Sequence, residues 1–299
     1  MSIYPDTPVR PAPDPSALLE LIKPITWFPP MWAYLCGVVS SGRPVTESPG
    51  LVLLGILLAG PVVCGMSQAA NDWCDRHVDA INEPGRPIPS GRVPGRWGLG
   101  VALGMSAVSL ALGWFLGPWG FGATVLAVLA AWAYSAEPVR LKRSGWAGPG
   151  LVGLCYEGLP WFTGAAVLAA GAPRAEVVAV AALYALGAHG IMTLNDFKAI
   201  EGDRATGVRS LPATLGPHRA ARVACFVMAA PQVLVIGLLA LWDRPLQAGA
   251  IAALLALQLW AMRVMLGDPR ARAPWYNGTG VTLYVAGMMV AAVALRGLG

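Results

Sequence analysis

Long apolar runs, separated by short polar segments, dominate the sequence. A helix needs about 20 largely apolar residues to cross a bilayer, and nine stretches meet that pattern. They are residues 20–40, 51–71, 97–116, 119–135, 149–170, 176–196, 218–240, 246–267 and 278–296. Residues 1–17 are proline-rich and polar, which predicts a disordered cytoplasmic tail and no cleaved signal peptide. We therefore expect an all-α, polytopic bundle of nine transmembrane helices, with residues 18–299 as a single membrane domain.

Composition and charge support this interpretation. Hydrophobic residues make up 56% of the 299 positions and charged residues only 12%, about half the charged share of a soluble domain. Of the 21 lysines and arginines, 17 lie in or next to the amino-terminal tail and the loops that follow the second, fourth, sixth and eighth predicted spans. The exceptions are Arg43, Arg174, Arg244 and Arg296. The positive-inside rule then predicts a multi-pass protein of the cell inner membrane, with a cytoplasmic N-terminus and an external C-terminus. The net charge of +5 follows from this topology and does not indicate nucleic acid binding.

A row of carboxylates follows the second apolar run, in the segment NDWCDRHVDAINEPGRPIPSG at 71–91. Asp72, Asp75 and Asp79 are spaced i, i+3, i+7, so on a helix they fall within an arc of about 60°. Magnesium accepts a few carboxylates, keeps its waters and bridges to phosphate oxygens. A solvated acidic helix end is the alternative, but the position at the end of a membrane span favours a metal site.

A second acidic segment, NDFKAIEGD at 195–203, begins at the end of the sixth apolar run. Asp196 and Asp203 share a helix face, and Glu201 joins them only if the helix breaks, for which Gly202 is suited. Both acidic segments lie on the same predicted side of the membrane. Two facing carboxylate clusters of this kind suit a diphosphate that is held by magnesium ions.

Basic and amide side chains near the two clusters are candidates for binding that diphosphate. They are Arg86, Lys142, Arg143, Lys198 and Arg209, with Asn71 and Asn195. Their alternative explanation is topological, because cytoplasmic loops carry lysine and arginine in any case. A diphosphate leaving group departs when metal ions and cations neutralise its developing charge. We assign the central catalytic roles to Asp72, Asp75 and Lys142, and the metal to Asp72, Asp75, Asp79, Asp196, Glu201 and Asp203.

These motifs resemble those of the UbiA-type intramembrane prenyltransferases. The first acidic segment, YSAEPVRLKRSGW at 134–146, YEGLPW at 156–161 and NDFKAIEGDRATGVRSLPATLG at 195–216 are similar to the chlorophyll and bacteriochlorophyll synthase branch. The resemblance implies a UbiA-type fold, magnesium as cofactor, and esterification of the propionate of bacteriochlorophyllide a by geranylgeranyl or phytyl diphosphate. It also implies association with other pigment-biosynthesis or photosystem assembly proteins. Many members carry an aspartate where this sequence has Ala199, so here Glu201 is the candidate for the missing carboxylate.

Four residues inside the apolar runs are candidates for binding the tetrapyrrole that this resemblance implies. His189 lies seven residues before Asp196, on the same helix face and about 10 Å deeper, and neutral imidazole is a common metal ligand. Glu157 is an ionisable residue within a membrane span, and Tyr156 and Trp161 flank it. A buried histidine bonded to a carbonyl, and a neutral buried glutamate, are the alternatives.

Two other functions remain open from the sequence. The first is the same fold with another acceptor, such as chlorophyllide, a quinone precursor or haem. The second is a non-catalytic, pigment-binding membrane scaffold, which would need histidine or glutamate ligands but not two acidic clusters. Metal-dependent release of diphosphate separates a transferase from a scaffold.

Overall fold

The computed structural model describes residues 12–298. The first eleven residues of the predicted tail lie outside the described part, and the tail's predicted end at residue 17 falls inside a helix, α1 (Pro15–Leu21). Asp14 caps this helix, because its side chain accepts a hydrogen bond of 3.0 Å from the Ser16 N–H, and proline occupies the first helical position. Regular structure therefore begins before the first predicted span.

Helices account for nearly all regular structure between residues 12 and 298, where the only β-type pairing is one bridge between Ser144 and Arg209. The longer helices after α1 are α2 (Phe28–Ser40), α3 (Pro49–Leu57), α4 (Gly65–Asn82), α5 (Trp97–Trp114), α6 (Gly117–Ser135), α8 (Leu159–Ala169), α9 (Ala175–Asn195), α12 (Pro217–Leu241), α13 (Pro245–Gly267) and α14 (Pro269–Arg296). Short helices are α7 (Ala147–Gly153), α10 (Ile200–Thr206) and α11 (Leu211–Leu215), with 3₁₀ turns η1 (Pro24–Thr26), η2 (Val45–Glu47), η4 (Leu141–Arg143) and η6 (Asp196–Lys198). The all-α prediction is confirmed.

Seven helical segments of the described chain are long and apolar enough to cross a membrane, which marks a membrane protein. They are Pro49–Asn82, Trp97–Trp114, Ala147–Ala169, Ala175–Lys198, Pro217–Leu241, Pro245–Gly267 and Pro269–Arg296. Each of the nine predicted ranges contains a helix, but α2 has only 13 residues and α6 does not join the seven. The predicted count of nine spans is therefore not confirmed.

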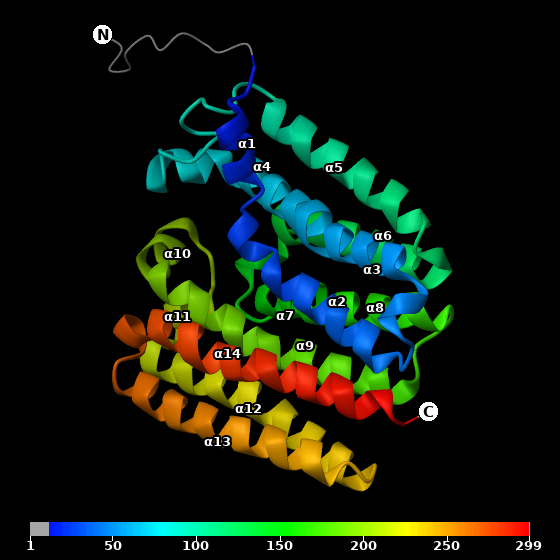
Figure 1. The fold of residues 1–299 in the computed structure, drawn as a ribbon. Coiled ribbons are helices and arrows are strands. Elements are labelled where there is room, and N and C mark those ends of the chain that lie inside the picture. The colour runs from blue at the N-terminus through cyan, green and yellow to red at the C-terminus, as the bar shows by residue number, and fades with distance from the viewer. Residues whose placement is uncertain (1–11, 299) are drawn as a thin grey trace, which may run out of the picture.

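The helices pack around α9, which runs through the middle of the molecule (Figure 1). Helix α9 packs against α7, α12 and α14, and α13 covers α12 and α14 from the far side. Helix α4 packs against α5 and α6 on the opposite side of the bundle. The main hydrophobic core lies along α9, α12 and α14. The first acidic segment belongs to α4 and the second follows α9, so the two come from different halves of the bundle.

Helices α2 and α8 cross so closely that their backbones are in contact. A Cβ atom on Gly37 would lie 2.0 Å from the carbonyl oxygen of Trp161, and one on Gly164 would lie 2.1 Å from that of Tyr34. Small residues permit such close crossings between membrane helices. The crossing fixes α2 and α8 as one unit.

Two membrane segments contain π-helical turns, η3 (Leu58–Cys64) between α3 and α4, and η5 (Leu154–Gly158) between α7 and α8. Pro61 lies inside η3, and Pro160 follows η5 by two residues. Proline has no N–H to donate and its ring displaces the carbonyl one turn earlier, so the regular α-helical ladder is interrupted. Turns of this kind are frequent at functional sites.

Candidate active site

A cavity of about 950 Å³ opens between the two halves of the bundle. Its walls come from η1, α2, η3, α4, α6, the segment from Arg140 to Tyr156, α9 and the segment from Asn195 to Ser210. The predicted site residues that line it are Asn71, Asp75, Asp79, Arg86, Lys142, Arg143, Tyr156, Asn195, Asp196, Lys198 and Asp203. Residues more than a hundred positions apart in the sequence therefore share one chamber.

Helix α4 contributes one continuous polar stripe to the cavity. Gln68, Asn71, Asp75, Asp79 and Asn82 line it, and their spacing of three or four residues places them on one helix face. Asn71 is oriented by Ser135 on α6, since its Nδ2 lies 3.2 Å from the serine hydroxyl oxygen. Of the predicted acidic face, Asp75 and Asp79 line the cavity together with Asn71 from its edge, whereas Asp72 does not.

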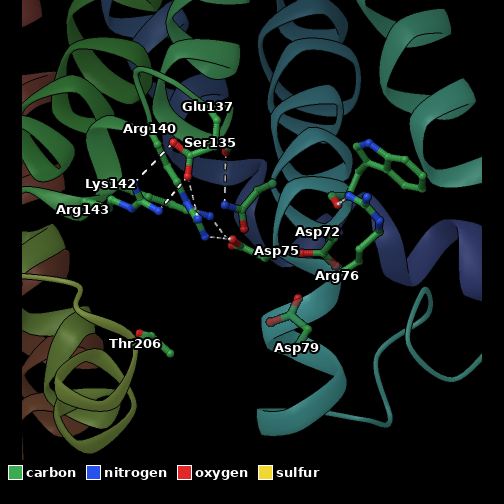
Figure 2. A network of polar contacts seen from close by, with 12 residues as sticks. Asp72, Asp75, Arg76, Asp79, Ser135, Glu137, Arg140, Lys142, Arg143 and Thr206 are labelled. Carbon is green, nitrogen blue, oxygen red and sulfur yellow. Dashed lines mark hydrogen bonds and ion pairs between the residues drawn. The ribbon is translucent and has the colours of Figure 1, made fainter.

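Asp75 lies between two cations from the loop that follows α6 (Figure 2). Arg140 Nη2 donates to Asp75 Oδ1 at 2.9 Å, and Lys142 Nζ donates to Asp75 Oδ2. Arg140 also contacts Glu137, whose carboxylate lies 2.7 Å from Arg143 Nη2. Burial lowers the pKa of Lys142, and the neighbouring Asp75 carboxylate opposes that shift. One carboxylate is thus surrounded by positive charge.

Asp72 and Asp79 also carry cationic partners. Arg86 Nη1 lies 2.9 Å from Asp79 Oδ2 and 3.5 Å from Asp72 Oδ1, and Lys23 Nζ lies 2.7 Å from the same Asp72 oxygen. Asp72 is only 2% exposed and does not line the cavity. Its other oxygen, Oδ2, is buried without a hydrogen-bond partner among the described residues. Asp72 therefore supports Arg86 from behind, while Asp75 and Asp79 face the chamber.

The second acidic cluster, Asp196 and Asp203, faces the first across the cavity and is electrostatically different. Within residues 12–298, neither carboxylate forms an ion pair. Ser210 Oγ donates to Asp203 Oδ2 at 2.5 Å. Burial raises the pKa of Asp203, and the bond from Ser210 opposes that shift. The neighbouring Asn195 is held by Asn277 on α14 at 2.9 Å.

Glu201 lies outside the cavity. Its side chain is 64% exposed and pairs with Arg270 at 2.6 Å, which lowers the pKa of this carboxyl. The helix breaks earlier than expected, because η6 and Ala199 interrupt it before α10 begins at Ile200. Breaking there brings Asp196 and Asp203 to the chamber and turns Glu201 toward Arg270. The structure does not bring this candidate metal ligand to the other carboxylates.

Arg209 acts through its backbone. Its N–H donates to the Arg143 carbonyl at 2.9 Å, and its own carbonyl accepts from the Gly145 N–H at 3.0 Å. These bonds tie the loop after α6 to the loop after α10, and Arg209 is not among the residues that line the cavity. Of the predicted diphosphate-binding residues, Arg209 alone is placed outside the chamber.

The candidate tetrapyrrole residues separate into two groups. Tyr156 lines the cavity, but Trp161 is fully buried, where it bonds to Ser40 at 3.0 Å. Glu157 and His189 are each 4% exposed and do not line the chamber. The His189 ring packs 5.2 Å from that of Trp146, and neither of its nitrogens has a hydrogen-bond partner among the described residues. Only Tyr156 is positioned to touch a ligand in the cavity.

Sequence reasoning missed several residues of the site. Lys23, Gln68, Tyr134 and Arg140 were not singled out, although the last three line the cavity. For Arg140 a signal existed, since it lies in the segment YSAEPVRLKRSGW, two residues before Lys142. For Gln68 the signal was its place one turn before Asn71 on the acidic face. Lys23 is 49 residues from its partner Asp72, and no spacing rule connects the two.

Magnesium fits the donors that face the chamber. Asp75, Asp79, Asp196 and Asp203 offer oxygen atoms only, which hard divalent cations prefer. Among the described residues no three acids, histidines or cysteines lie close enough to enclose a metal by themselves. Mg²⁺ is commonly held by one or two carboxylates together with substrate phosphates and water.

Comparison with known proteins places the chain in a family. Residues 27–294 match the UbiA prenyltransferase family, so the chain belongs to that family. It is 72% identical to the bacteriochlorophyll synthase 33 kDa chain of Cereibacter sphaeroides, over 100% of this chain and 97% of that one. It is 35% identical to the chloroplastic chlorophyll synthase of Arabidopsis thaliana, over 92% of this chain and 73% of that one. The resemblance to the bacteriochlorophyll and chlorophyll synthase branch is confirmed.

The fold is also that of solved family members. A UbiA homolog from Archaeoglobus fulgidus, bound to GPP and Mg²⁺, superposes with a TM-score of 0.71 at 19% identity, over 93% of this chain and 100% of that one. At this identity the likeness concerns the fold. The UbiA-type architecture expected from the motifs is therefore confirmed.

Proposed function

We propose that the protein is a prenyltransferase that moves a C20 group, geranylgeranyl or phytyl, from its diphosphate to the propionate carboxylate of bacteriochlorophyllide a. The observation that carries this proposal is the 72% identity, over the whole chain, with a bacteriochlorophyll synthase. The cavity supports it independently, because it combines two acidic clusters, several cations and a large apolar surface.

The reaction breaks one C–O bond and forms another. The bond between C1 of the prenyl group and the diphosphate oxygen breaks, and both electrons leave with the diphosphate. A propionate oxygen then attacks C1, which gives the ester and inorganic diphosphate. The carboxylate is already an anion at neutral pH, so no strong general base is needed, and the main task is to stabilise the leaving charge.

Asp75 and Asp79 on one wall, with Asp196 and Asp203 on the other, would hold magnesium. When bound, the metal neutralises diphosphate charge as the bond to carbon breaks. Asp72 lies behind this set and orients Arg86. Glu201 is not included, because it pairs with Arg270 outside the chamber.

Lys142, Arg140 and Arg86 supply the positive charge of the protein itself. Each pairs with an acidic side chain of α4 and lines the cavity. Arg140 Nε is buried without a partner among the described residues, so this guanidinium has a donor left for an anion. Arg143 and Lys198 line the same chamber and extend this positive surface, while Asn71 and Asn195 offer amide donors.

The experiment that tests the function uses purified protein, magnesium, and a panel of tetrapyrrole acids with C15 and C20 diphosphates. The ester of bacteriochlorophyllide a with a C20 group, identified by mass, is the expected product. Asp75→Asn gives the matched inactive control. Esters formed only with haem or a quinone precursor would overturn the acceptor. Pigment binding without any release of diphosphate would indicate a scaffold.

The positive-inside pattern further supports an inner-membrane protein with a cytoplasmic active site and N-terminus and an external C-terminus. A reporter fused after Arg92 or Arg209 should then be cytoplasmic, and one fused after Arg174 external. An external position for either acidic segment would contradict a shared site.

A further inference from the structure

A small polar cluster lies in the cavity at membrane depth, away from the acidic residues. Tyr156, Gln68, Cys64 and Thr26 all line the chamber there. Gln68 Nε2 donates to the Tyr156 hydroxyl at 3.0 Å, and Cys64 Sγ lies 3.3 Å from the same oxygen. The thiol also lies 3.3 Å from Thr26 Oγ1. The rest of this part of the cavity is mostly apolar, so the cluster needs an explanation.

The cluster keeps one hydrogen-bond donor and one acceptor free to bind a ligand in the chamber. The Tyr156 oxygen accepts from both the Gln68 amide and the Cys64 thiol, so the hydrogen of the hydroxyl is left for a ligand, with the Thr26 side chain as the neighbouring alternative. The carbonyl oxygen of Gln68 likewise has no hydrogen-bond donor in the described chain. Tyr156 and Gln68 are half-buried, so a ligand that covered them without offering a polar atom would leave these groups unpaired, at a cost of about 1–3 kcal/mol. A ligand with a polar atom would satisfy both groups.

The two π-helical turns bring this cluster together. Cys64 is the last residue of η3, and Tyr156 lies in the middle of η5. The contact between their side chains joins the two interrupted membrane segments. Since such turns carry an energetic cost and gather at functional sites, their meeting at a cavity wall is a second observation that points to a ligand.

The cavity offers the prenyl chain a different path. Ala127, Ala130 and Ala131 of α6, with Val63 and Ala59 of η3, form an apolar wall. A hydrocarbon tail placed there leaves no polar group unpaired, whereas a tail over Tyr156 would bury an unpaired donor and acceptor. The polar wall therefore suits the acceptor.

The distance between the two ends of the site fixes which part of the acceptor reaches the cluster. Gln68 precedes Asp75 by seven residues, or about 10 Å along the helix. If the propionate of the acceptor reacts beside Asp75, the cluster is far enough away to contact a part of the macrocycle other than the pyrrole ring that carries the propionate.

We propose that Tyr156 donates a hydrogen bond to the acetyl carbonyl oxygen on the rim of the tetrapyrrole, which lies on a ring other than the one that bears the reacting propionate. Gln68 is the positioning residue, because its amide orients the hydroxyl. This inference rests on the proposed function and adds to it the carbonyl group by which the protein recognises its acceptor. A site built to bond a polar group discriminates against an analogue that lacks it.

The test uses two magnesium bacteriochlorins that differ in one substituent, bacteriochlorophyllide a, which carries an acetyl group at position 3, and its analogue with a vinyl group there. Full-length protein and its Tyr156→Phe variant are compared for kcat and for KM of each acceptor and of geranylgeranyl diphosphate. The variant should raise KM for the acetyl acceptor roughly three- to tenfold, as expected for one neutral hydrogen bond. KM for the vinyl acceptor and for the diphosphate should stay within about twofold.

Two further variants keep the test decisive. Tyr34→Phe removes a hydroxyl that bonds to the Leu51 carbonyl away from the cavity, so it should not separate the two acceptors. Gln68→Met should show the same selectivity as Tyr156→Phe with a smaller change, and it serves if the tyrosine variant does not fold. Equal effects on both acceptors, or a raised KM for the diphosphate, would overturn the proposal. If the unsubstituted protein forms no ester with either bacteriochlorin, the proposed function itself fails.

Discussion

The two acidic clusters of the cavity look alike in sequence and differ in charge balance. On α4, all three aspartates are paired with lysine or arginine, from as far away as Lys23. Across the chamber, Asp196 and Asp203 have no ion pair within the described chain. The first cluster is therefore internally neutralised, and the second presents unbalanced negative charge. A cation entering the chamber meets the second cluster without displacing any side chain, but must compete with lysine and arginine at the first.

The largest expected effect comes from Asp75→Asn. This change removes the carboxylate that two cations share and one of the oxygen donors for magnesium. Turnover should fall about 10²-fold or more, as when a key electrostatic stabiliser is lost. Steady-state rates at saturating magnesium measure the effect, and membrane insertion should be retained. Near-normal turnover would remove the first cluster from the chemistry.

A smaller change is expected for Asp196→Asn, and it should appear mainly in the metal dependence. Because this carboxylate has no competing cation, its loss should raise the magnesium concentration for half-maximal activity roughly 10- to 100-fold. Titration of activity with magnesium measures the shift. An unchanged magnesium requirement would contradict the assignment of the second cluster as the open metal site.

The free energy of unfolding should depend more on the first acidic cluster than on the second. Asp72→Asn leaves Lys23 without its buried anionic partner, while Arg86 keeps its ion pairs with Asp79 and Glu83, and the change should lower the free energy of unfolding by about 1–3 kcal/mol. Asp196→Asn removes a half-buried charge that has no ion-pair partner in the described chain, and it should not destabilise the fold. Thermal unfolding in detergent, without magnesium, compares the two variants. Equal losses would mean that the pairing of the first cluster contributes nothing.

The smallest effect is expected for Glu201→Gln. This side chain is mostly exposed and its partner is Arg270, and exposed ion pairs contribute only about 0–1 kcal/mol. Activity and magnesium dependence should change less than twofold, while Asp203→Asn, two residues on, should reduce activity at limiting magnesium. A strong loss for Glu201→Gln would return this residue to the metal site.

Local spacing predicted the parts of the site that lie on one helix. On α4, residue spacing identified Asn71, Asp75 and Asp79, because helix geometry is regular, but it missed Gln68 and Asn82 and placed Asp72 on a face that does not line the cavity. The second cluster was only partly predictable, since the break at η6 and Ala199 decides which acids face the cavity. The partners Lys23 and Arg140 depend on how distant loops fold back onto α4, and single-chain spacing carries no information about that. The same holds for His189 and Trp161, whose burial away from the chamber depends on packing with α7 and α2.

The touching backbones of α2 and α8 make one wall of the chamber rigid. Gly37 and Gly164 leave no side chain between the helices that could rearrange. Pro30 on α2 and Tyr156, just before α8, line the cavity on either side of that contact. The segment that carries Asp196 and Asp203, by contrast, is built from the short helices η6 and α10 and the loops around them. Adaptation to a differently shaped acceptor should consequently arise through substitutions in the segment that carries Asp196 and Asp203. The close crossing at Gly37 and Gly164 should stay unchanged.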